Sequence, residues 1–433
     1  MLLRIEDTDV ERSRQHHAEQ ILQSLQWLGV SWDEGPIYQS DRLDRYRERA
    51  EELVANGNAY RCYCTVEELE AERAAVEAKG DAYRYSGRCR RRAESGDPQH
   101  DDAPHVIRCK VDPGPIEFHD LIRGDVQFEG ELIDDFVLIR SDGNPTYHLS
   151  VVVDDVDMEI THVARGDDHL SNTPKHIVLF RAFGAKEPVF AHLPLILGSD
   201  RKRLSKRTGA TSAEEYRDLG IVPQALFNFL TLLGWNPGGD RELITADEAA
   251  QVFDLSDVNK APAVFDPEKL LWMNGQYLMR MPADEIYPHL APFLPGDTNF
   301  AELRGAIELN KARGRTLREI AAQLEPYLVD DGALEYEKEA AKKHLKGDDL
   351  ASRMSELHDV LEKTEPFDVA TTEAALRALA ESKGVSAAKL IHPLRLALTG
   401  RGASPGIFDV MVVLGRDRTL TRLRRLISRL PGV

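Results

Sequence analysis

The sequence lacks long apolar runs, and no stretch approaches the ~18 uninterrupted apolar residues that a membrane-spanning helix needs. It also lacks an export signal, because the first residues already turn acidic at Glu6 and Asp7. These two absences predict a cytoplasmic protein that makes no membrane contact.

Basic residues are outnumbered, with 55 Lys and Arg against 73 Asp and Glu, which gives a net charge of −18. This balance argues against a protein that binds nucleic acids non-specifically over its whole surface. It is compatible with RNA binding through local basic patches, and it also fits a surface that is acidic only for solubility.

Cysteine is scarce, and its four positions all lie in the first quarter of the chain: Cys62, Cys64, Cys89 and Cys109. In a cytosolic protein this clustering favours a metal site over a disulfide framework. Cys62, Cys64 and Cys89 would supply three thiolates to a structural zinc ion, which takes four ligands, and Cys109 is one candidate for the fourth. The alternative is that the cysteines are reduced and packed as small apolar side chains.

What the chain does contain predicts an α/β first half. At 433 residues it should hold two to four domains. The expected helices cover 17–28 and 40–54, with Ser40 as an N-cap, and another helix starts at an N-capping Thr173 followed by Pro174. The expected strands are 136–140, 147–153, 162–168 and 193–197. In particular, Val151-Val152-Val153 before Asp154-Asp155 is typical of a buried parallel strand that ends at a functional loop.

The second half has a different pattern. After about Thr211 no convincing strand is found, and helical periodicity continues to the end of the chain. We expect a mostly helical bundle or superhelix there.

A basic loop follows the last expected strand of the first half. Arg201-Lys202-Arg203-Leu204-Ser205-Lys206-Arg207 carries five cations in seven residues. A mobile clamp on phosphate groups requires such a loop, because lysine provides a point charge that can follow pyrophosphate as it leaves. A solvated basic loop is the alternative.

Within this loop, Arg203–Arg207 resembles the "KMSKS" signature of class I aminoacyl-tRNA synthetases in the form that glutamyl enzymes use. Other segments resemble the glutamate–tRNA ligase family in the same order along the chain. They are 3–9, 32–36, 60–64, 147–155, 161–169, 233–235, 265–274 and, near the end, 398–401 with 404–405. The resemblance covers essentially the whole chain, and the ordered set is far more specific than any single motif.

The resemblance implies an incomplete Rossmann-type parallel sheet with an inserted acceptor-binding domain, followed by an all-α anticodon-binding half. The implied domains are a catalytic domain (1–42 and 149–210), the insertion (43–148), a stem-contact helical domain (211–285) and an anticodon-binding domain (286–433). A monomer is expected.

The implied reaction joins L-glutamate to tRNA(Glu) in two steps, through glutamyl-adenylate, with ATP and Mg²⁺. Neither step needs a protein nucleophile, so catalysis consists of positioning and charge stabilisation. By resemblance, Lys206 contacts the ATP phosphates, while Lys202, Arg203 and Ser205 support it. Asp168 and His169 fall where the family lines the pocket for ATP and substrate.

Glutamate recognition requires a cation for the side-chain carboxylate and an anion for the amino group. By resemblance, Arg165 faces the carboxylate, Tyr147 hydrogen-bonds the substrate and Glu6 pairs with the ammonium group. The structural alternatives are an Arg165 salt bridge to Asp167 or Asp168, a Tyr147 that is an ordinary strand aromatic and a Glu6 that is a surface carboxylate.

The resemblance also bears on the metal site. Some family members complete a zinc site with a tyrosine four residues before the last cysteine, and others with a histidine two residues after it. Here Tyr85 matches the first pattern, whereas Arg91 stands at the histidine position. The expected ligands are therefore Cys62, Cys64, Tyr85 and Cys89, with Cys109 as the rival to Tyr85.

Two arginine clusters are candidates for tRNA contact, with a solvated surface as the alternative for both. The first surrounds the cysteines: Arg84, Arg88, Arg90, Arg91 and Arg92. The second lies on a C-terminal helix, where a leucine stripe faces the core and four arginines are expected to face outward: Arg422, Arg424, Arg425 and Arg429.

Family members begin with a strand, a loop that grips glutamate and a helix opened by the "HIGH" signature, and none of these is found before Leu2. Two interpretations stay open. Either Met1 is an internal methionine of a complete enzyme, or the chain is a truncated, catalytically impaired tRNA-binding relative. The first is favoured because the other site residues are intact. Activity of the chain as given depends on which interpretation holds, because the missing part belongs to the ATP site.

Overall fold

The computed structural model describes residues 1–8, 15–80, 83–96, 103–204 and 212–430. Contacts divide the chain into two compact units: Met1–Thr211 with Phe227–Asp266, and Ser212–Leu226 with Pro267–Val433. The chain passes from one unit to the other within α8 (Pro223–Thr231). This division does not test the boundaries of the four predicted domains, which stay a prediction.

The first unit mixes helices and strands. Its helices are α1 (Gln15–Trp27), α2 (Leu43–Ala55), α3 (Val66–Glu77), α4 (Arg88–Glu94), α5 (Tyr147–Asp157), α6 (Thr173–Ala182) and α9 (Ala246–Val252). Its strands are β1 (Leu2–Ile5), β2 (Glu34–Tyr38), β3 (Ala59–Cys62), β4 (Val106–Cys109), β5 (Pro115–Asp120), β6 (Gly124–Glu129), β7 (Val137–Ile139), β8 (His162–Gly166), β9 (Val189–Leu193), β10 (Ile196–Leu197) and β11 (Ala263–Val264).

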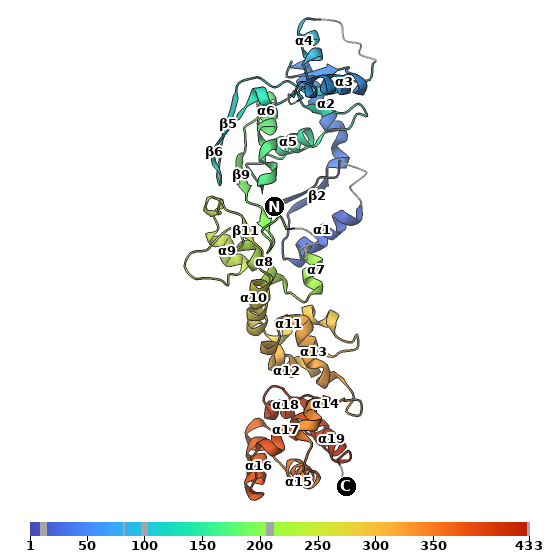
Figure 1. Ribbon diagram of the computed structural model, residues 1–433, viewed down its shortest axis with the longest axis vertical. Helices are drawn as coiled ribbons and strands as arrows, with labels where there is room; N and C mark the ends of the chain where they lie inside the picture. Colours follow the sequence, from blue (N-terminus) through green and yellow to red (C-terminus); the bar gives the residue numbers. More distant parts are fainter. Residues whose placement is uncertain (9–14, 81–82, 97–102, 205–211, 431–433) are drawn as a thin grey trace. The chain divides into compact units, whose positions relative to one another are not determined.

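Parallel pairing joins β1 to β2, β8 to β9 and β10 to β11. The β5–β6 hairpin extends the β8–β9 pair, because β5 pairs with β9, and it lies beside α6 (Figure 1). The strands β3, β4 and β7 form a separate antiparallel sheet. The predicted α/β class with a parallel-containing sheet is therefore confirmed.

The predicted strand over 147–153 is wrong, because these residues form the first part of α5. Every residue from Leu149 to Asp155 is buried, so the helix is enclosed around its whole circumference there. A short apolar run of this kind does not distinguish a buried helix from a buried strand. Here packing against α2 and α6 outweighs the strand preference of the three valines.

Two predicted helix caps are also wrong. The helix α2 begins at Leu43, and Ser40 donates its backbone N–H and its hydroxyl to Asp7 (2.8 and 2.7 Å). The N-cap of α6 is Asn172, and Thr173 is the first helical residue. Both side chains are used in contacts distant in sequence, which a local pattern does not reveal.

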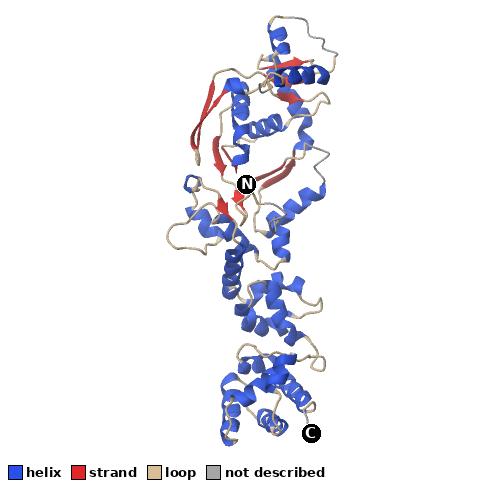
Figure 2. Ribbon diagram, viewed as in Figure 1, coloured by secondary structure: helices blue, strands red, loops and turns tan. Residues whose placement is uncertain are grey.

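The second unit consists of helices and loops among its described residues (Figure 2). They are α7 (Ala213–Asp218), α10 (Pro267–Arg280), α11 (Ala283–Leu290), α12 (Phe300–Asn310), α13 (Leu317–Leu328), α14 (Lys338–His344), α15 (Leu350–Glu362), α16 (Val369–Ser382), α17 (Ala388–Thr399), α18 (Ile407–Leu414) and α19 (Arg416–Ile427). The predicted helical C-terminal half is confirmed. In the described part of the chain after Thr211, the expectation of no strand fails only at β11, which is two residues long and shows no alternation.

Among the described residues, no helix combines the length and the apolar character that crossing a membrane requires.

Candidate functional site

The residues predicted to bind glutamate lie around one cavity of about 460 Å³ in the first unit. Glu6 follows β1, Tyr147 opens α5 and Arg165 lies on β8. His169, in the 3-10 helix after β8, also lines the cavity. The chain thus brings together side chains that are up to 163 residues apart, from Glu6 to His169.

Arg165 is held entirely by neutral groups. Its Nε donates to His192 Nε2 (3.3 Å), its Nη1 lies 3.2 Å from His176 Nδ1, and its Nη2 donates to Thr173 Oγ1 (2.8 Å). No described carboxylate forms an ion pair with it. Burial lowers the pKa of Arg165, which measures the cost of holding this charge away from water.

The carboxylates near Arg165 are engaged elsewhere. Asp167 pairs with Arg123 (2.5 Å) and Asp168 with Arg203 (3.0 Å), so neither forms the salt bridge considered as the alternative role of Arg165. In the cavity, Glu6 and Asp155 both bind the guanidinium of Arg4 (3.1 and 2.9 Å). Arg165 is therefore a half-buried cation that faces the cavity without an ion pair to a described carboxylate, although Glu6 and Asp155, which also line the cavity, act electrostatically to raise its pKa.

Tyr147 lies among histidine rings, with its ring centroid 5.7 Å from that of His176 and 6.2 Å from that of His169. Burial raises the pKa of its hydroxyl, which therefore stays protonated and available as a donor at neutral pH. This aromatic residue begins a helix, so the alternative role of an ordinary strand aromatic does not apply.

The basic loop is anchored at its start. Gly198 N–H donates to the Lys202 carbonyl (2.8 Å) and Leu204 N–H to the Ile196 carbonyl (3.0 Å). The ion pair between Arg203 and Asp168 joins this loop to the cavity wall near His169. Ser205, Lys206 and Arg207, the remaining predicted residues of the motif, lie outside the described residues.

The predicted metal ligands meet at the junction of β3 and α4. The ligand atoms of Cys62, Cys64 and Cys89 all lie within 4.8 Å of one another. Tyr85 Oη lies 3.3 Å from Cys62 Sγ and 3.5 Å from Cys64 Sγ. Cys109 is not in this group, because its thiol is fully buried in the apolar core and faces the Lys110 carbonyl.

Two arginine side chains lie beside the cysteine cluster. Burial raises the pKa of the Cys64 thiol to about 11, while a bond from Arg88 Nη2 to Cys64 Sγ (3.3 Å) acts in the opposite direction. Arg108 stacks on the ring of Tyr85, with its guanidinium carbon 4.3 Å from the centroid. These cations would stabilise thiolates that bind a metal ion.

The arginines around the cysteines largely bond within the protein. Arg84 donates to the Glu131 carbonyl, Arg90 to the Val111 carbonyl and Asp135, and Arg91 to the Ser86 carbonyl. Arg88 pairs with Glu68 (2.7 Å). Contact of this cluster with tRNA phosphates stays a prediction.

The expectation that the arginines of α19 face outward is wrong for Arg422, whose side chain is fully buried. It pairs with Asp331 (2.7 Å) and donates to the Leu398 carbonyl. Arg424 donates to His358 (2.8 Å), and Arg425 to the Leu334 carbonyl (2.7 Å). A helical repeat identifies the leucine face but does not identify which arginine at its border is covered by a loop.

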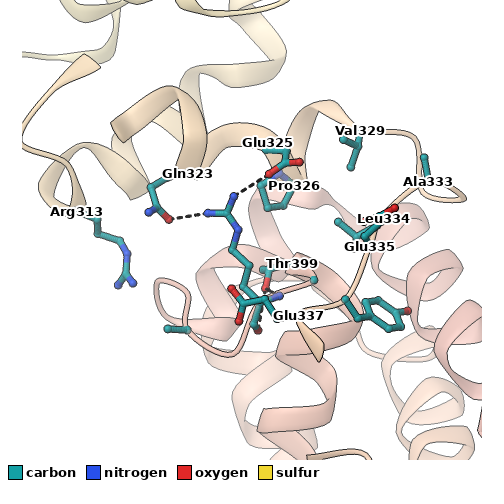
Figure 3. Close-up of a pocket in the computed structure, with 14 residues that line it drawn as sticks. Arg313, Gln323, Glu325, Pro326, Val329, Ala333, Leu334, Glu335, Glu337 and Thr399 are labelled. Atoms are coloured by element: carbon teal, nitrogen blue, oxygen red, sulfur yellow. Dashed lines mark hydrogen bonds and ion pairs between the residues drawn. The ribbon is translucent and has the colours of Figure 1, made fainter. Parts of the chain in front are cut away.

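A second cavity, of about 730 Å³, lies in the second unit. In the cavity shown in Figure 3, Arg401, from the loop after α17, donates to Gln323 and Glu325 of α13 (3.1 and 2.9 Å). Arg313 and Tyr336 also line it. Among the described residues, Arg313 has no ion pair or side-chain hydrogen bond. The cavity thus offers an uncommitted cation, whereas the ring of Tyr336 already has the guanidinium carbons of Arg425 and Arg429 5.7 Å from its centroid.

Sequence reasoning missed several residues around the first cavity, including Arg4, Asp155, Thr173, His176 and His192. Arg4 and Asp155 lie inside motifs that resemble the family, but the only sign of a role for either residue was its charge. The two histidines lie in apolar stretches where a single imidazole is indistinguishable from a core residue.

Family models, related sequences and solved structures all match this chain to the same kind of protein. Models of two families match the chain: "tRNA synthetases class I (E and Q), catalytic domain" over residues 1–272 and "Anticodon binding domain" over residues 285–427. The glutamate–tRNA ligase 2 of Koribacter versatilis is 45% identical, over 98% of this chain and 90% of its own length. The glutamate–tRNA ligase of Syntrophotalea carbinolica is 43% identical, over 99% and 91%. A crystal structure of a glutamate tRNA ligase from Elizabethkingia meningosepticum in complex with its amino acid matches with a TM-score of 0.85 and 32% identity, over 99% of this chain and 92% of that chain.

Proposed function

The chain belongs to the glutamate–tRNA ligase family of class I tRNA synthetases, and we propose that it attaches L-glutamate to tRNA(Glu) with ATP. The observation that carries this proposal is Arg165, a half-buried guanidinium that faces a cavity with no described carboxylate as its partner. A substrate carboxylate would supply the missing charge and two acceptor oxygens in one plane. None of the comparisons favours a catalytically impaired relative.

In the proposed reaction, the glutamate α-carboxylate attacks the α-phosphate of ATP, and pyrophosphate leaves. A ribose hydroxyl of the terminal adenosine of tRNA then attacks the glutamyl carbonyl, and AMP leaves. Arg165 binds the side-chain carboxylate, Tyr147 donates a hydrogen bond, and Glu6 accepts from the ammonium group. Mg²⁺ would neutralise charge on the phosphate oxygens.

We assign phosphate contacts to the basic loop. The ion pair between Arg203 and Asp168 supports this assignment, because it ties the start of the loop to the wall of the glutamate cavity. Lys202 and Arg203 would stabilise charge on the leaving pyrophosphate, together with Ser205 and Lys206. Asp168 and His169 would then border both ATP and glutamate.

The second unit would bind the anticodon arm, as the match of residues 285–427 to an anticodon-binding family implies. Its cavity suits an RNA phosphate, because the cation Arg313 is uncommitted.

The function is tested by charging assays with the full chain, ATP, and purified tRNA(Glu). We expect glutamate to be attached and glutamine to be rejected by at least about a thousandfold in kcat/KM, because an amide leaves the charge of Arg165 without a counter-charge. Omission of ATP is the control. If the two amino acids were attached equally well, the proposed function would be wrong.

We also propose that Cys62, Cys64, Cys89 and Tyr85 bind one structural zinc ion. Their mutual distances suit a tetrahedral site, since Zn–S bonds of about 2.3 Å place neighbouring sulfur atoms about 3.7 Å apart. Cys64 Sγ and Cys89 Sγ lie 3.5 Å apart.

Metal analysis tests this assignment. Protein purified without a histidine tag is expected to contain about one zinc ion per chain, and Cys64→Ala about none. Cys109→Ala is the matched control, because it removes a cysteine that lies outside the cluster and should keep the zinc. Zinc-free wild-type protein, or zinc retained by Cys64→Ala, would refute the site.

A further inference from the structure

A buried polar network lies behind Arg165 and connects it to a carboxylate on another strand. Asp120, at the end of β5, lies 2.6 Å from Nδ1 of His192 on β9. His192 Nε2 in turn accepts from Arg165 Nε and lies 3.0 Å from Thr173 Oγ1. Asp120, His192 and Thr173 are fully buried.

The charge state of Asp120 determines which nitrogen of His192 carries the proton. Asp120 accepts from the backbone N–H groups of Ile122, Arg123 and His192 (3.0, 2.8 and 3.2 Å). Burial alone would raise the pKa of Asp120, but these bonds outweigh it and lower the pKa, so the group is a carboxylate. A carboxylate only accepts, so the proton of His192 lies on Nδ1 and leaves Nε2 free to accept from Arg165.

The same reasoning determines which nitrogen of His176 carries the proton. Arg165 Nη1 only donates, so His176 Nδ1 accepts, and the proton of His176 lies on Nε2, which faces His148 Nδ1 at 3.2 Å. Burial lowers the pKa of His176 far below its usual value and that of His148 to about 4, so both rings are neutral at physiological pH. All three histidines thus have a single tautomer dictated by Arg165 and Asp120.

This arrangement engages all three nitrogens of the Arg165 guanidinium without cancelling its charge. A carboxylate in place of either ring would hold the guanidinium as firmly but would compete with the substrate. A guanidinium has five N–H donors, and the contacts with His192, His176 and Thr173 occupy three. The other two N–H groups belong to Nη1 and Nη2, the pair that a carboxylate binds. Tyr147, which lines the same cavity, also hydrogen-bonds the guanidinium.

We propose that His192, oriented by Asp120, is a positioning residue that holds Arg165 for recognition of the glutamate side chain, with His176 and Thr173 as the other two supports. This proposal rests on the proposed function of Arg165. The Asp120 contact also makes the β5–β6 hairpin part of the substrate site, although the hairpin itself does not line the cavity.

Two substitutions of His192 separate its two contacts. In His192→Asn the amide nitrogen takes the position of Nδ1, so the bond to Asp120 is kept and the acceptor for Arg165 is lost. In His192→Gln the amide takes the position of Nε2, so an acceptor for Arg165 is kept and the bond to Asp120 is lost. The two variants carry the same amide group and differ by one methylene.

Binding of L-glutamate to the full chain is measured by titration calorimetry, alongside the melting temperature. We expect His192→Asn to weaken glutamate binding by roughly tenfold to a hundredfold, and His192→Gln by less than about threefold. If His192 only stabilised the fold, His192→Gln would weaken glutamate binding more than His192→Asn, because His192→Gln loses the bond to Asp120, which is the more buried of the two. Equal affinities in the two variants, or weaker binding by His192→Gln, would overturn the proposal.

Thr173→Val provides a second measurement if His192→Asn does not fold. It removes one acceptor of Arg165 with little change in shape, and we expect roughly tenfold weaker glutamate binding. Unchanged binding would count against the network. Arg165→Met separates this proposal from the proposed function. If Arg165→Met binds glutamate like the wild type, the function assigned to Arg165 is wrong. If Arg165→Met loses glutamate binding but the His192 and Thr173 variants keep it, the role of His192 is refuted and the function of Arg165 stands.

Discussion

Arg165→Met is expected to lower kcat/KM for glutamate by roughly a thousandfold, while KM for ATP changes by less than about threefold. The loss corresponds to about 4 kcal/mol, which is the size expected for two charge-assisted hydrogen bonds to one carboxylate. The effect falls on glutamate because the guanidinium faces the glutamate cavity and no described carboxylate binds it. The measurement is steady-state charging of tRNA(Glu) with varied glutamate.

A second substitution of Arg165 and the melting temperature extend this prediction. Arg165→Lys keeps the charge but loses the planar pair of donors, so we expect an intermediate loss of roughly thirtyfold. Arg165→Met should melt no lower than the wild type, because methionine replaces a half-buried charge whose burial lowers its pKa and that forms no ion pair with a described carboxylate. A large fall in melting temperature together with an unchanged KM for glutamate would contradict the assignment.

Much of the fold was predictable from the sequence because its determinants are local. Helical periodicity identified the C-terminal half. Gly57 follows α2 with a positive φ of 77°, the conformation in which glycine commonly ends a helix. The prediction of a strand where the structure has α5 failed for a physical reason. Its buried carboxylate Asp154 accepts from Gln39 (2.9 Å) and Arg42 (2.8 Å), contacts from more than a hundred residues away that no local pattern contains.

The candidate site was predictable only where a motif carried it. Glu6, Tyr147 and Arg165 were found through family resemblance, and the structure brings them around one cavity, although their roles stay predictions. Spacing could not decide between Tyr85 and Cys109 as the fourth metal ligand, because that depends on which of them folds next to Cys62. His192 could not be assigned at all, since its role depends on two partners 72 and 27 residues away.

The arginines of α19 show the same limit in the second unit. A buried Arg422 cannot be read from a helical wheel, because its counter-charge Asp331 lies in the loop between α13 and α14. This ion pair closes the loop over the helix. Its carbonyl contacts, with Leu398 and Val329, engage one donor on each of the two Nη atoms.

Asp331→Ala is therefore expected to destabilise the second unit by about 3–5 kcal/mol, because it leaves Arg422 buried without its counter-charge. Urea unfolding followed by circular dichroism measures the change. Asp330→Ala is the matched control, because that neighbouring carboxylate is exposed and should change stability by less than about 0.5 kcal/mol. Similar stabilities of the two variants would show that the pair contributes nothing.

The pH dependence gives an independent test of the same pair. Burial acts to raise the pKa of Asp331, but the bonds from Arg422 and Arg418 outweigh it and lower the pKa in the folded protein. A group with a lowered folded pKa stabilises the protein above its unfolded pKa, about 3.9, and loses this effect as the pH falls through the folded value. The difference between wild type and Asp331→Ala should therefore be full at neutral pH and shrink below about pH 4. In the double variant with Arg422→Met the loss should be smaller than the sum of the two single losses, because the uncompensated charge is gone.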